Sequence, residues 1–534
     1  MQGLWIRPAG FTIRITAEER ICLVRKYSGC QIRLQHIQKA GAQGMRPTFM
    51  GLETAKRGLM VNQKAIDIVG NNITNMQTKG YTRQRLDTVS VQVYGGMGGF
   101  QTSSIPLAGQ GVDMLGVAQI RNPYLDSKFR EQYGEVGYYD QRTAIMQELE
   151  GIISDPETEG TGLKDALTIL SQALADFGEQ PYQETNANIT LNAVKGITHI
   201  LNEYDSKLKN AMQEQKDDLA ASVKDINGKL KQLAELNKSI VHEVFVSDDL
   251  DGVSYGPNDL LDQRNVILDD LSRYGNVSVT EGGDGWIQVK FNGKTVVDSS
   301  GNQFTSDELL IGPDGVTLTW NSDNSGMHLE NGALKAYTDV ITGNAPGNAG
   351  IPYYQQKLDD FAAAFGELMN NTIHEDDGTA VFKTLIEAEG GGALTAGNIS
   401  VSTAWAEDPS YVIRDQNPDG TLDNTDIMKL KAGLTEERTF GKEYKYSGNF
   451  SGFITNYTDT LGSDIKTTKA RLNASLAIAE SVEKDRQGVS GVSLNEEGIN
   501  LMTYNKAYQA LGRLMTTMDE QLDMIINQMG MVGR

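Results

Sequence analysis

The chain has 534 residues, of which 39% are hydrophobic and 22% charged, values typical of a multidomain globular protein with sizeable cores. Its 48 Lys and Arg against 70 Asp and Glu give a formal net charge of −22, which argues against nucleic acid as the main partner. No run of about 18 apolar residues predicts a transmembrane helix. Five histidines and two cysteines are too few for a multi-metal site or a disulfide scaffold.

Residues 1–44 differ in composition from the rest of the chain. They hold both cysteines, Cys22 and Cys30, and seven Lys or Arg against two Glu. They lack the apolar region and the cleavage site of a secretory signal. We expect Met45 to be the biological start and 1–44 to be an upstream extension, the alternative being a basic tail. Residues 45–534 contain no cysteine, which is consistent with an extracellular protein without disulfides.

The first predicted element is an amphipathic helix. Its apolar residues Leu52, Leu59, Ile66 and Ile73 recur every seven positions, with Ala55 and Val69 at the intermediate position. This spacing is typical of a helix that packs against a partner helix. The helix is expected to end within 70–75, because Asn and Gly tolerate the left-handed conformation that stops helices. The residues that follow predict a turn into extended chain.

Helical periodicity returns in four stretches, at 163–177, 200–240, 353–373 and about 452–485. Each has one apolar stripe and a polar remainder, so each needs neighbours that bury that stripe. We expect the four to form an antiparallel bundle or rod.

Strand signals concentrate between these helices. The apolar alternation around Asn292-Gly293 predicts a hairpin over 287–297. A second hairpin is expected over 309–320, and a short helix over 258–274 precedes both. Residues 375–447 mix Gly, Asp and short β runs, of which the clearest is 398–403.

The last predicted helix spans 494–529 and has an apolar seam. From Leu501 onward the seam follows a 3, 4 spacing for four heptads. A terminal helix with such a seam needs partners, and the N-terminal helix is the nearest candidate. Association between subunits would complete its burial, the alternative being an internal core helix. The seam consists of Leu494, Leu501, Tyr504, Tyr508, Leu511, Met515, Met518, Leu522, Ile525 and Met529.

Together these elements predict a multidomain, mainly α protein. It would have paired terminal coiled-coil helices and an α-helical rod or bundle domain, with inserted antiparallel β-rich outer domains. The expected boundaries are 1–44 for the extension, 45–85 plus 490–534 for the terminal helical (axial core) domain, 86–245 plus 350–374 and 448–489 for the rod domain, 246–349 for a β-rich domain with a short helix, and 375–447 for a second, looser β and loop insertion.

Motifs for catalysis are absent from the sequence. There is no G-x-S-x-G, H-E-x-x-H, Walker or C-x-x-C motif, and the histidines are scattered singly. We therefore predict no enzyme activity and no cofactor. Residues from Asp415 to Asp426 have the ligand spacing of a calcium loop. Pro418 and an Asp instead of Glu at the last position favour an ordinary surface turn, so we assign no metal site.

One stretch of the chain carries a family resemblance. Asn71-Asn72-Ile73-Thr74-Asn75 followed by Thr78-Lys79-Gly80-Tyr81-Thr82-Arg83-Gln84 resembles the N-terminal signature of flagellar rod, hook and hook-associated proteins. Its Tyr-Thr-Arg-Gln ending is similar to the hook-associated protein 1 family of the hook–filament junction, more than to rod or hook proteins. Residues 260–272 and 500–523 also match. The resemblance covers 45–534, weakest over 375–447, and 1–44 has no counterpart.

The resemblance implies a structural subunit of the bacterial flagellum. Such subunits are exported unfolded by the flagellar type III pathway, without a cleaved signal, and become part of the extracellular flagellum. About eleven copies would form a ring through their terminal helices. The implied partners are the flagellar hook protein, the second junction protein (hook-associated protein 3) and an export chaperone on the C-terminal helix. The alternative is an extracellular surface or adhesin-type binding protein stabilised by calcium.

The residues that we expect to carry assembly belong to the two terminal helices and the signature. They are Leu52, Leu59, Ile66, Asn71, Asn72, Asn75, Gly80, Tyr81, Leu501, Tyr504, Tyr508, Leu511, Met515, Met518, Leu522 and Ile525.

Overall fold

The structure is a computed structural model of the chain. The chain divides into two compact units, one made of Met1–Gln63, Val89–Asp113 and Lys506–Arg534, the other of Lys64–Thr88 and Met114–Asn505. No helix among the described residues is both long enough and apolar enough to cross a membrane. The structure describes residues 5–6, 13–14, 50–91, 111–153, 162–242, 246–248, 253–282, 285–298, 304–375, 381–413 and 423–528.

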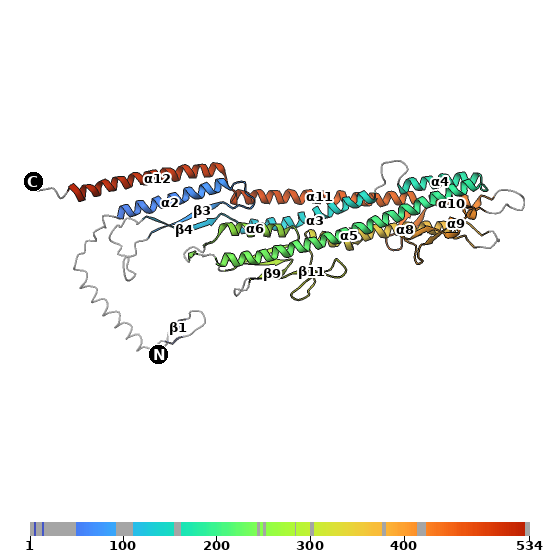
Figure 1. Ribbon diagram of the computed structural model, residues 1–534, viewed down its shortest axis with the longest axis horizontal. Coiled ribbons are helices and arrows are strands. Elements are labelled where there is room, and N and C mark those ends of the chain that lie inside the picture. Colours follow the sequence, from blue (N-terminus) through green and yellow to red (C-terminus); the bar gives the residue numbers. More distant parts are fainter. Residues whose placement is uncertain are drawn as a thin grey trace, which may run out of the picture. The chain divides into compact units, whose positions relative to one another are not determined.

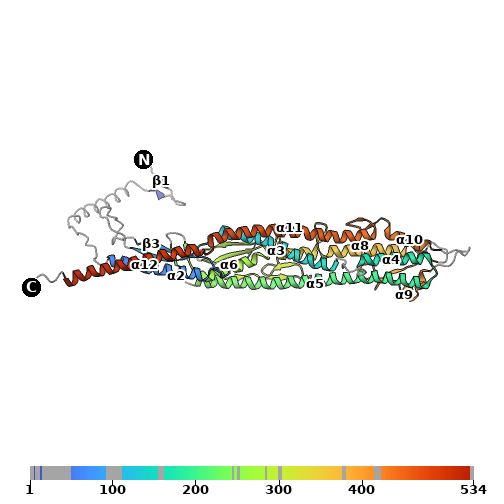
Figure 2. The ribbon, with the colours of Figure 1, turned by 90° about the horizontal axis from the view of Figure 1, so that it is seen from above.

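The first unit contains the beginning of α2 (Met50–Thr74) and most of α12 (Leu494–Asp523). These two helices run side by side in both views (Figures 1 and 2). A side chain at Gly51 of α2 would collide with Met518, and one at Gly58 would collide with Leu511. Glycines seven residues apart therefore leave room on α2 for two large seam residues of α12.

Three short elements complete the terminal regions. A five-residue π-helix (Met524–Gln528) follows α12. Strands β1 (Trp5–Ile6) and β2 (Ile13–Arg14) pair antiparallel with each other. Both terminal helices that the periodicity predicts are thus confirmed, the first beginning at Met50.

The second unit is built on long helices. They are α3 (Pro123–Ile153), α4 (Leu163–Glu179), α5 (Glu184–His242), α8 (Ile351–Asn370) and α11 (Phe450–Ser490). Helix α3 packs along α11, and α4 packs along α5 (Figure 1). The four predicted bundle helices are confirmed as helices, although α5 begins well before residue 200.

Helix α3 was not among the predicted helices. It buries Arg130, Gly134, Gly137 and Arg142 beside its apolar residues, so no single apolar stripe marks its inner face. Gly137 is one of these because a side chain there would collide with the carbonyl of Arg273. The close approach of two backbones selects glycine at this position.

An aromatic cluster lies in the core of this unit. Phe361 and Phe365 of α8 pack against Phe450 and Phe453 at the start of α11, with ring centroids of Phe361 and Phe450 5.3 Å apart. The ring of Phe440 lies tilted against that of Phe453, with centroids 4.5 Å apart. Such contacts add to the stability that burial of apolar area already provides.

The predicted strands between the helices are also present. An antiparallel sheet has the order β10 (Thr305–Ser306), β9 (Lys294–Asp298), β8 (Ile287–Phe291), β7 (Val277–Glu281). Asn292 and Gly293 both have positive φ, 47° and 83°, as a two-residue hairpin turn requires. Strands β11 (Leu309–Ile311) and β12 (Leu318–Trp320) form the second hairpin, and α6 (Asn258–Ser272) is the predicted short helix.

Smaller pairs of strands lie at the joints between helices. Strands β5 (Val246–Asp248) and β6 (Val253–Tyr255) pair after α5. Helix α7 (Ala333–Thr342) leads into the pair β13 (Asn344–Ala345) and β14 (Asn348–Ala349) before α8.

The described part of 375–447 contains helices as well as strands. Helix α10 (Thr425–Thr435) packs on α4, and Trp405 in α9 (Thr403–Glu407) is completely buried. The predicted β run at 398–403 includes β16, which pairs with β15. The remaining elements are β15 (Ile386–Ala388), β16 (Ile399–Val401), the 3-10 helix η2 (Pro409–Val412), β17 (Arg438–Phe440) and β18 (Tyr446–Gly448).

Candidate functional site

The Asn-rich signature forms the turn that links α2 to strand β3 (Gln84–Ser90), which pairs with β4 (Val112–Gln119). Asn72 is buried, and its Oδ1 accepts hydrogen bonds from the Gln84 N–H at 3.0 Å and from the Tyr81 hydroxyl at 2.8 Å. Its Nδ2 donates to the Gln84 carbonyl at 2.9 Å. The Asn72 amide thus satisfies both backbone groups of Gln84, as a neighbouring strand would.

Further side chains of the signature bond to one another around this turn. Asn75 Nδ2 donates to Asn71 Oδ1 at 2.8 Å, and Asn71 Nδ2 donates to the Tyr81 hydroxyl at 3.3 Å. Thr78 Oγ1 donates to Asn75 Oδ1 at 3.2 Å. Burial, with the nearby charges of Asp262 and other carboxylates, raises the pKa of Tyr81 to about 12. The Tyr81 hydroxyl therefore stays protonated and can donate at any physiological pH.

Gly80 takes a conformation that few other residues adopt. Its φ is +82°, and a side chain there would also collide with Val266 of α6. Both the left-handed backbone and the close contact with α6 select glycine at this position.

Arg83 joins the signature to the elbow between α11 and α12. Its N–H donates to the carbonyl of Ser490, the last residue of α11, at 2.9 Å. Its guanidinium bonds Glu497 Oε1 at 2.7 Å and Glu496 Oε2 at 2.5 Å, both in the first turn of α12. Glu497 is only 1% exposed, so this charge depends on Arg83 for its partner.

Sequence reasoning did not find this ion pair. The available signal was the acidic pair Glu496-Glu497 at the start of a predicted helix, next to an apolar seam. Carboxylates at a helix N-terminus are common, and their long-range partner depends on the fold.

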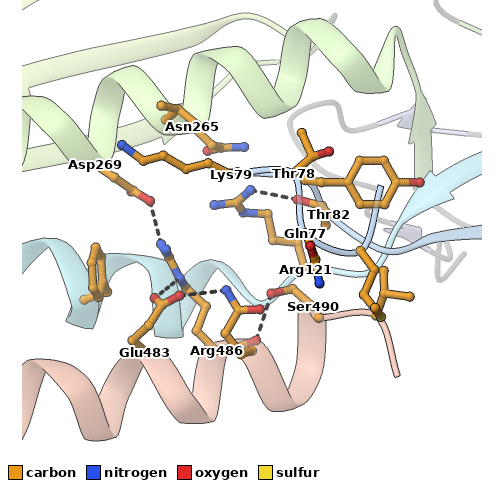
Figure 3. Close-up of a pocket in the computed structure, with 18 of the residues that line it drawn as sticks. Gln77, Thr78, Lys79, Thr82, Arg121, Asn265, Asp269, Glu483, Arg486 and Ser490 are labelled. Atoms are coloured by element: carbon orange, nitrogen blue, oxygen red, sulfur yellow. Dashed lines mark hydrogen bonds and ion pairs between the residues drawn. The ribbon is translucent and has the colours of Figure 1, made fainter. Parts of the chain in front are cut away.

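Hydrogen bonds and ion pairs connect the signature to α3 and α11. Thr82 Oγ1 accepts from Arg121 Nη1 at 3.1 Å (Figure 3). Arg121 donates two hydrogen bonds to the Asp126 carboxylate, from Nε at 2.7 Å and from Nη2 at 3.1 Å. Arg486 of α11 lies 3.5 Å from the same carboxylate. The signature is thereby connected to α3 and to α11 through two arginines.

Arg486 lies at the centre of this network. It bonds Asp269 of α6 at 2.6 Å and lies 2.8 Å from Glu483 (Figure 3). Its guanidinium also stacks on the Phe129 ring, 4.1 Å from the centroid. Burial by itself would lower the pKa of Arg486, but the charge of Asp269 and the other carboxylates raises it overall. Arg130 completes the network by bonding Asp269 at 2.8 Å.

A pocket of about 410 Å³ lies between the signature turn, α3, α6 and α11 (Figure 3). Lys79 lies at the pocket, 3.6 Å from Asp270. No histidine or cysteine is among the described residues that line it, and no group of three His, Cys, Asp or Glu in the described chain could hold a metal. Ion pairs and hydrogen bonds join the elements around this pocket, and such contacts suit a structural role.

The apolar seam residues of the terminal helices are less buried than the apolar residues of the core helices. On α2, Leu52, Leu59 and Ile66 are half-buried, and small residues between them, including Ala55 and Gly58, are buried instead. Ala55 and Val69, at the intermediate positions of the predicted stripe, are both buried, and the closest packing of α2 uses its small residues.

On α12 every predicted seam residue that the structure describes retains exposed area. Tyr508 is 38% exposed, and Ile525, in the π-helix that follows α12, is 47% exposed. The half-buried seam residues are Leu501, Tyr504, Leu511, Met515, Met518 and Leu522. Ile499, Met502 and Leu514, outside the predicted seam, are also exposed. Glu497 is the one buried residue among the described part of α12.

The proposed calcium loop lies mostly outside the described residues, at 414–422. Its last residue, Asp426, accepts hydrogen bonds from the His374 N–H at 3.1 Å and pairs with the His374 ring at 2.9 Å. Lys429 also bonds this carboxylate at 3.2 Å. These partners give Asp426 a structural role in the first turn of α10.

The regions of the terminal helices and the signature turn match family models of flagellar proteins. Residues 52–82 match the family model of flagella basal body rod proteins, and 487–529 match the C-terminal model of flagellar basal body rod FlgEFG proteins. Both ends of the chain are therefore similar to proteins of the flagellar basal body rod. Between these ends, 146–379 match the helical domain of flagellar hook-associated protein FlgK.

Relatives that match most of the chain share one name. The chain is 28% identical to flagellar hook-associated protein 1 of Bacillus subtilis, over 92% of this chain and all of the relative. It is 23% identical to the protein of that name from Salmonella typhimurium, over 89% of this chain and 98% of the relative. These relatives confirm the resemblance to hook-associated protein 1 over most of the chain.

A solved structure has the same fold. The flagellar hook junction protein FlgK from Burkholderia pseudomallei superposes with a TM-score of 0.52, covering 68% of this chain and all of that one. The two are 13% identical in sequence. The predicted fold class, mainly α with helical ends and inserted antiparallel sheets, is confirmed.

Proposed function

We propose that the protein is a subunit of the junction between the flagellar hook and the filament. The observation that carries the proposal is that relatives covering nearly the whole chain are hook-associated protein 1. The similar solved structure is that of a flagellar hook junction protein. The family consists of structural proteins, and we propose a structural rather than a catalytic role.

We further propose that subunits associate through α2 and α12. Along α12, the predicted seam and residues outside it both keep apolar area exposed, among them Met502 and Tyr508. Apolar area of this extent on a terminal helix is typical of a protein–protein contact. A ring of about eleven subunits, with the hook protein on one side and hook-associated protein 3 on the other, would cover it.

Export is proposed to follow the flagellar type III pathway, with the chain unfolded and an export chaperone on α12. Methionine is frequent on this helix, with Met502, Met515 and Met518 all carrying exposed area. Flexible, polarisable side chains suit a surface that packs first against a chaperone and later against neighbouring helices. The cysteine-free 45–534 also suits a final extracellular location.

Deletion of the gene tests the proposal. Electron microscopy of the deletion strain should show hooks without filaments, and the wild-type chain supplied in trans should restore filaments. Filaments of normal length on the deletion strain would contradict the junction role. They would favour the alternative of an extracellular surface protein.

A further inference from the structure

The four-stranded sheet ends at β7, which pairs with β8 and with no other strand of the described chain. At the opposite edge of the sheet, β10 packs against α5. An edge strand presents backbone N–H and C=O groups that the sheet itself does not use. Strand β7 is therefore the edge to which another strand can be added, provided that its unused groups face open space.

The hydrogen bonds at the two ends of β7 show which of its backbone groups bind β8. The Asn292 N–H donates to the Asn276 carbonyl at 2.8 Å just before β7, and the Gly282 N–H donates to the Trp286 carbonyl at 2.8 Å just after it. In an antiparallel pair every second residue exchanges hydrogen bonds with its neighbour. The even-numbered residues of β7 are therefore the ones that bond β8.

The odd-numbered residues of β7 direct their backbone groups away from β8. They are Val277, Val279 and Glu281, and no backbone hydrogen bond joins them to any other described element. Their N–H and C=O groups follow one another along the edge. This pattern of partial charges is complementary to the backbone of another extended chain.

A cavity of about 580 Å³ runs along this edge. All five residues of β7 line it, whereas β8 contributes only Ile287. A cavity over one face of the sheet would instead be lined by alternate residues of both strands, because successive side chains point to opposite faces. The first turns of α3, with Pro123 and Ser127, together with α6 and the end of β4 form its other walls. The cavity is therefore a groove beside the free edge of β7.

The lining of the groove is apolar on the side of the protein core. Its apolar side chains come from β4, α6, β7 and β8, and they are Ala118, Leu261, Leu268, Val277, Val279 and Ile287. The remaining residues of β7, Ser278, Thr280 and Glu281, are exposed. An added strand would thus place alternate side chains on an apolar surface and in water, and the carboxylate of Glu281 would favour a basic residue opposite it.

We propose that this groove binds an extended segment of a partner polypeptide, which joins the sheet as a fifth strand beside β7. Main-chain hydrogen bonds to Val277, Val279 and Glu281 would hold the segment, and its alternation of apolar and polar residues would give specificity. The walls of α3 and α6 suit a single strand better than the edge of a second sheet, so the occupant is a partner's segment and not the same edge of a second copy. The proposal does not depend on the junction role.

A blocked synthetic peptide of sequence Lys-Gln-Val-Lys-Phe is the probe. It copies β8, the strand that β7 already pairs with, except that Lys replaces the first residue. Added antiparallel to β7, it would place its Val opposite Val279 and its first Lys opposite Glu281. Calorimetry with the full chain should show saturable binding with a Kd below about 1 mM. The same peptide with N-methyl groups on its Val and Phe cannot donate to β7 and should not bind.

Val279→Pro tests the site on the protein. Proline removes the outward N–H of Val279 but leaves the bonds between β7 and β8, so it should fold and weaken peptide binding at least fivefold. Val279→Thr has nearly the same shape and keeps the N–H, so it is the matched control and should bind like the parent. Glu281→Gln should weaken binding about two- to fivefold, as expected for an exposed ion pair.

Three results would overturn the proposal. They are absence of peptide binding, equal binding of the N-methylated peptide, and equal binding by Val279→Pro, which would mean that the peptide replaces β8 or binds elsewhere. The N-methylated peptide decides the matter on the parent protein even where Val279→Pro is unstable. Sedimentation tests the other occupant: a parent dimer that Val279→Pro dissociates, with no peptide binding, would assign the edge to a second copy and also overturn the proposal.

Discussion

Asn72 holds Gln84 by both of its backbone groups, with the Oδ1 of Asn72 on the Gln84 N–H and its Nδ2 on the Gln84 carbonyl. The Asn72 side chain, at the end of α2, thus makes the two backbone hydrogen bonds that a neighbouring strand would make. These bonds set the direction in which β3 begins. The Tyr81 hydroxyl, bonded to the same Oδ1, keeps the amide in this orientation. The Asn-rich signature therefore fixes the turn between α2 and β3 through side-chain hydrogen bonds.

Asn72→Ala should destabilise the protein by about 2 kcal/mol, because it leaves the Gln84 N–H and carbonyl without partners in a buried site. The loss would be measured by urea unfolding of the parent and the variant. Asn75→Ala is the matched control, since its hydrogen bonds are exposed and should contribute less than about 0.5 kcal/mol. Equal losses in the two variants would contradict the role given to Asn72.

Gly80→Ala should be more destabilising than Gly293→Ala. Both glycines have positive φ, +82° and +83°, but a side chain at Gly293 meets nothing within 4 Å whereas one at Gly80 meets Val266. The shared cost of the left-handed backbone is about 1 kcal/mol, and the collision adds to it. Val266→Ala in the Gly80→Ala background should recover the added part, measured by the same unfolding assay. No recovery would show that the contact with α6 is not limiting.

Gly80→Val adds a β-branched side chain to the same position and should block assembly onto hooks while export continues. Motility and immunodetection of the secreted chain report the two steps separately. Normal swimming of this variant would contradict a role for the signature turn in assembly.

Arg83→Ala should cost about 3 kcal/mol, because Glu497 would remain buried without its cation. The loss should appear locally as faster proteolysis at the elbow between α11 and α12, near Gly491. Glu496→Gln is the control, since the Glu496 side chain is 61% exposed and its pair with Arg83 is worth little. If Arg83→Ala were as protease-resistant as the control, the elbow would be held by other contacts.

Asp426 should make stability depend on acid pH. Burial by itself would raise the pKa of Asp426, but hydrogen bonds from His374 and Lys429 lower it below the ordinary value. An acid with a lowered folded-state pKa stabilises the fold above its unfolded-state pKa, and that stability is lost as the pH falls through the folded-state value.

Between about pH 5 and pH 3 the parent should therefore lose more stability than Asp426→Asn, which has no charge to protonate. Unfolding curves at several pH values measure the difference. Parallel losses in the two proteins would mean that other carboxylates dominate the acid transition.

The double variant Leu511→Asp with Met518→Asp should abolish filament growth and chaperone binding. These residues pack over Gly58 and Gly51 of α2 and lie near the middle of the predicted seam. Anchors of this kind usually cost more than about 2 kcal/mol each when removed. Complementation reports filament growth, and calorimetry with the purified chaperone reports the other interaction.

Thr516→Asp is the matched control on α12, because Thr516 is exposed and bonds the Gly512 carbonyl of its own helix. It should leave both interactions nearly intact. A double variant that bound chaperone and grew filaments normally would show that the seam serves only the contact between α2 and α12.

The sequence by itself determined the elements with regular periods. The seams of α2 and α12, the four bundle helices and the hairpin at Asn292-Gly293 all follow local patterns that need no knowledge of distant contacts. The signature residues were found through family resemblance, and their hydrogen bonds became clear only when Asn72 and Gln84 were placed together.

Only the tertiary structure decided the features that depend on distant partners. Helix α3 has no apolar stripe because it buries Arg130 and Arg142 in ion pairs and polar contacts with other elements. The partner of Arg83 lies 414 residues away at Glu497. Periodicity reports which face of an element is apolar, whereas buried charges are placed by the fold that neutralises them.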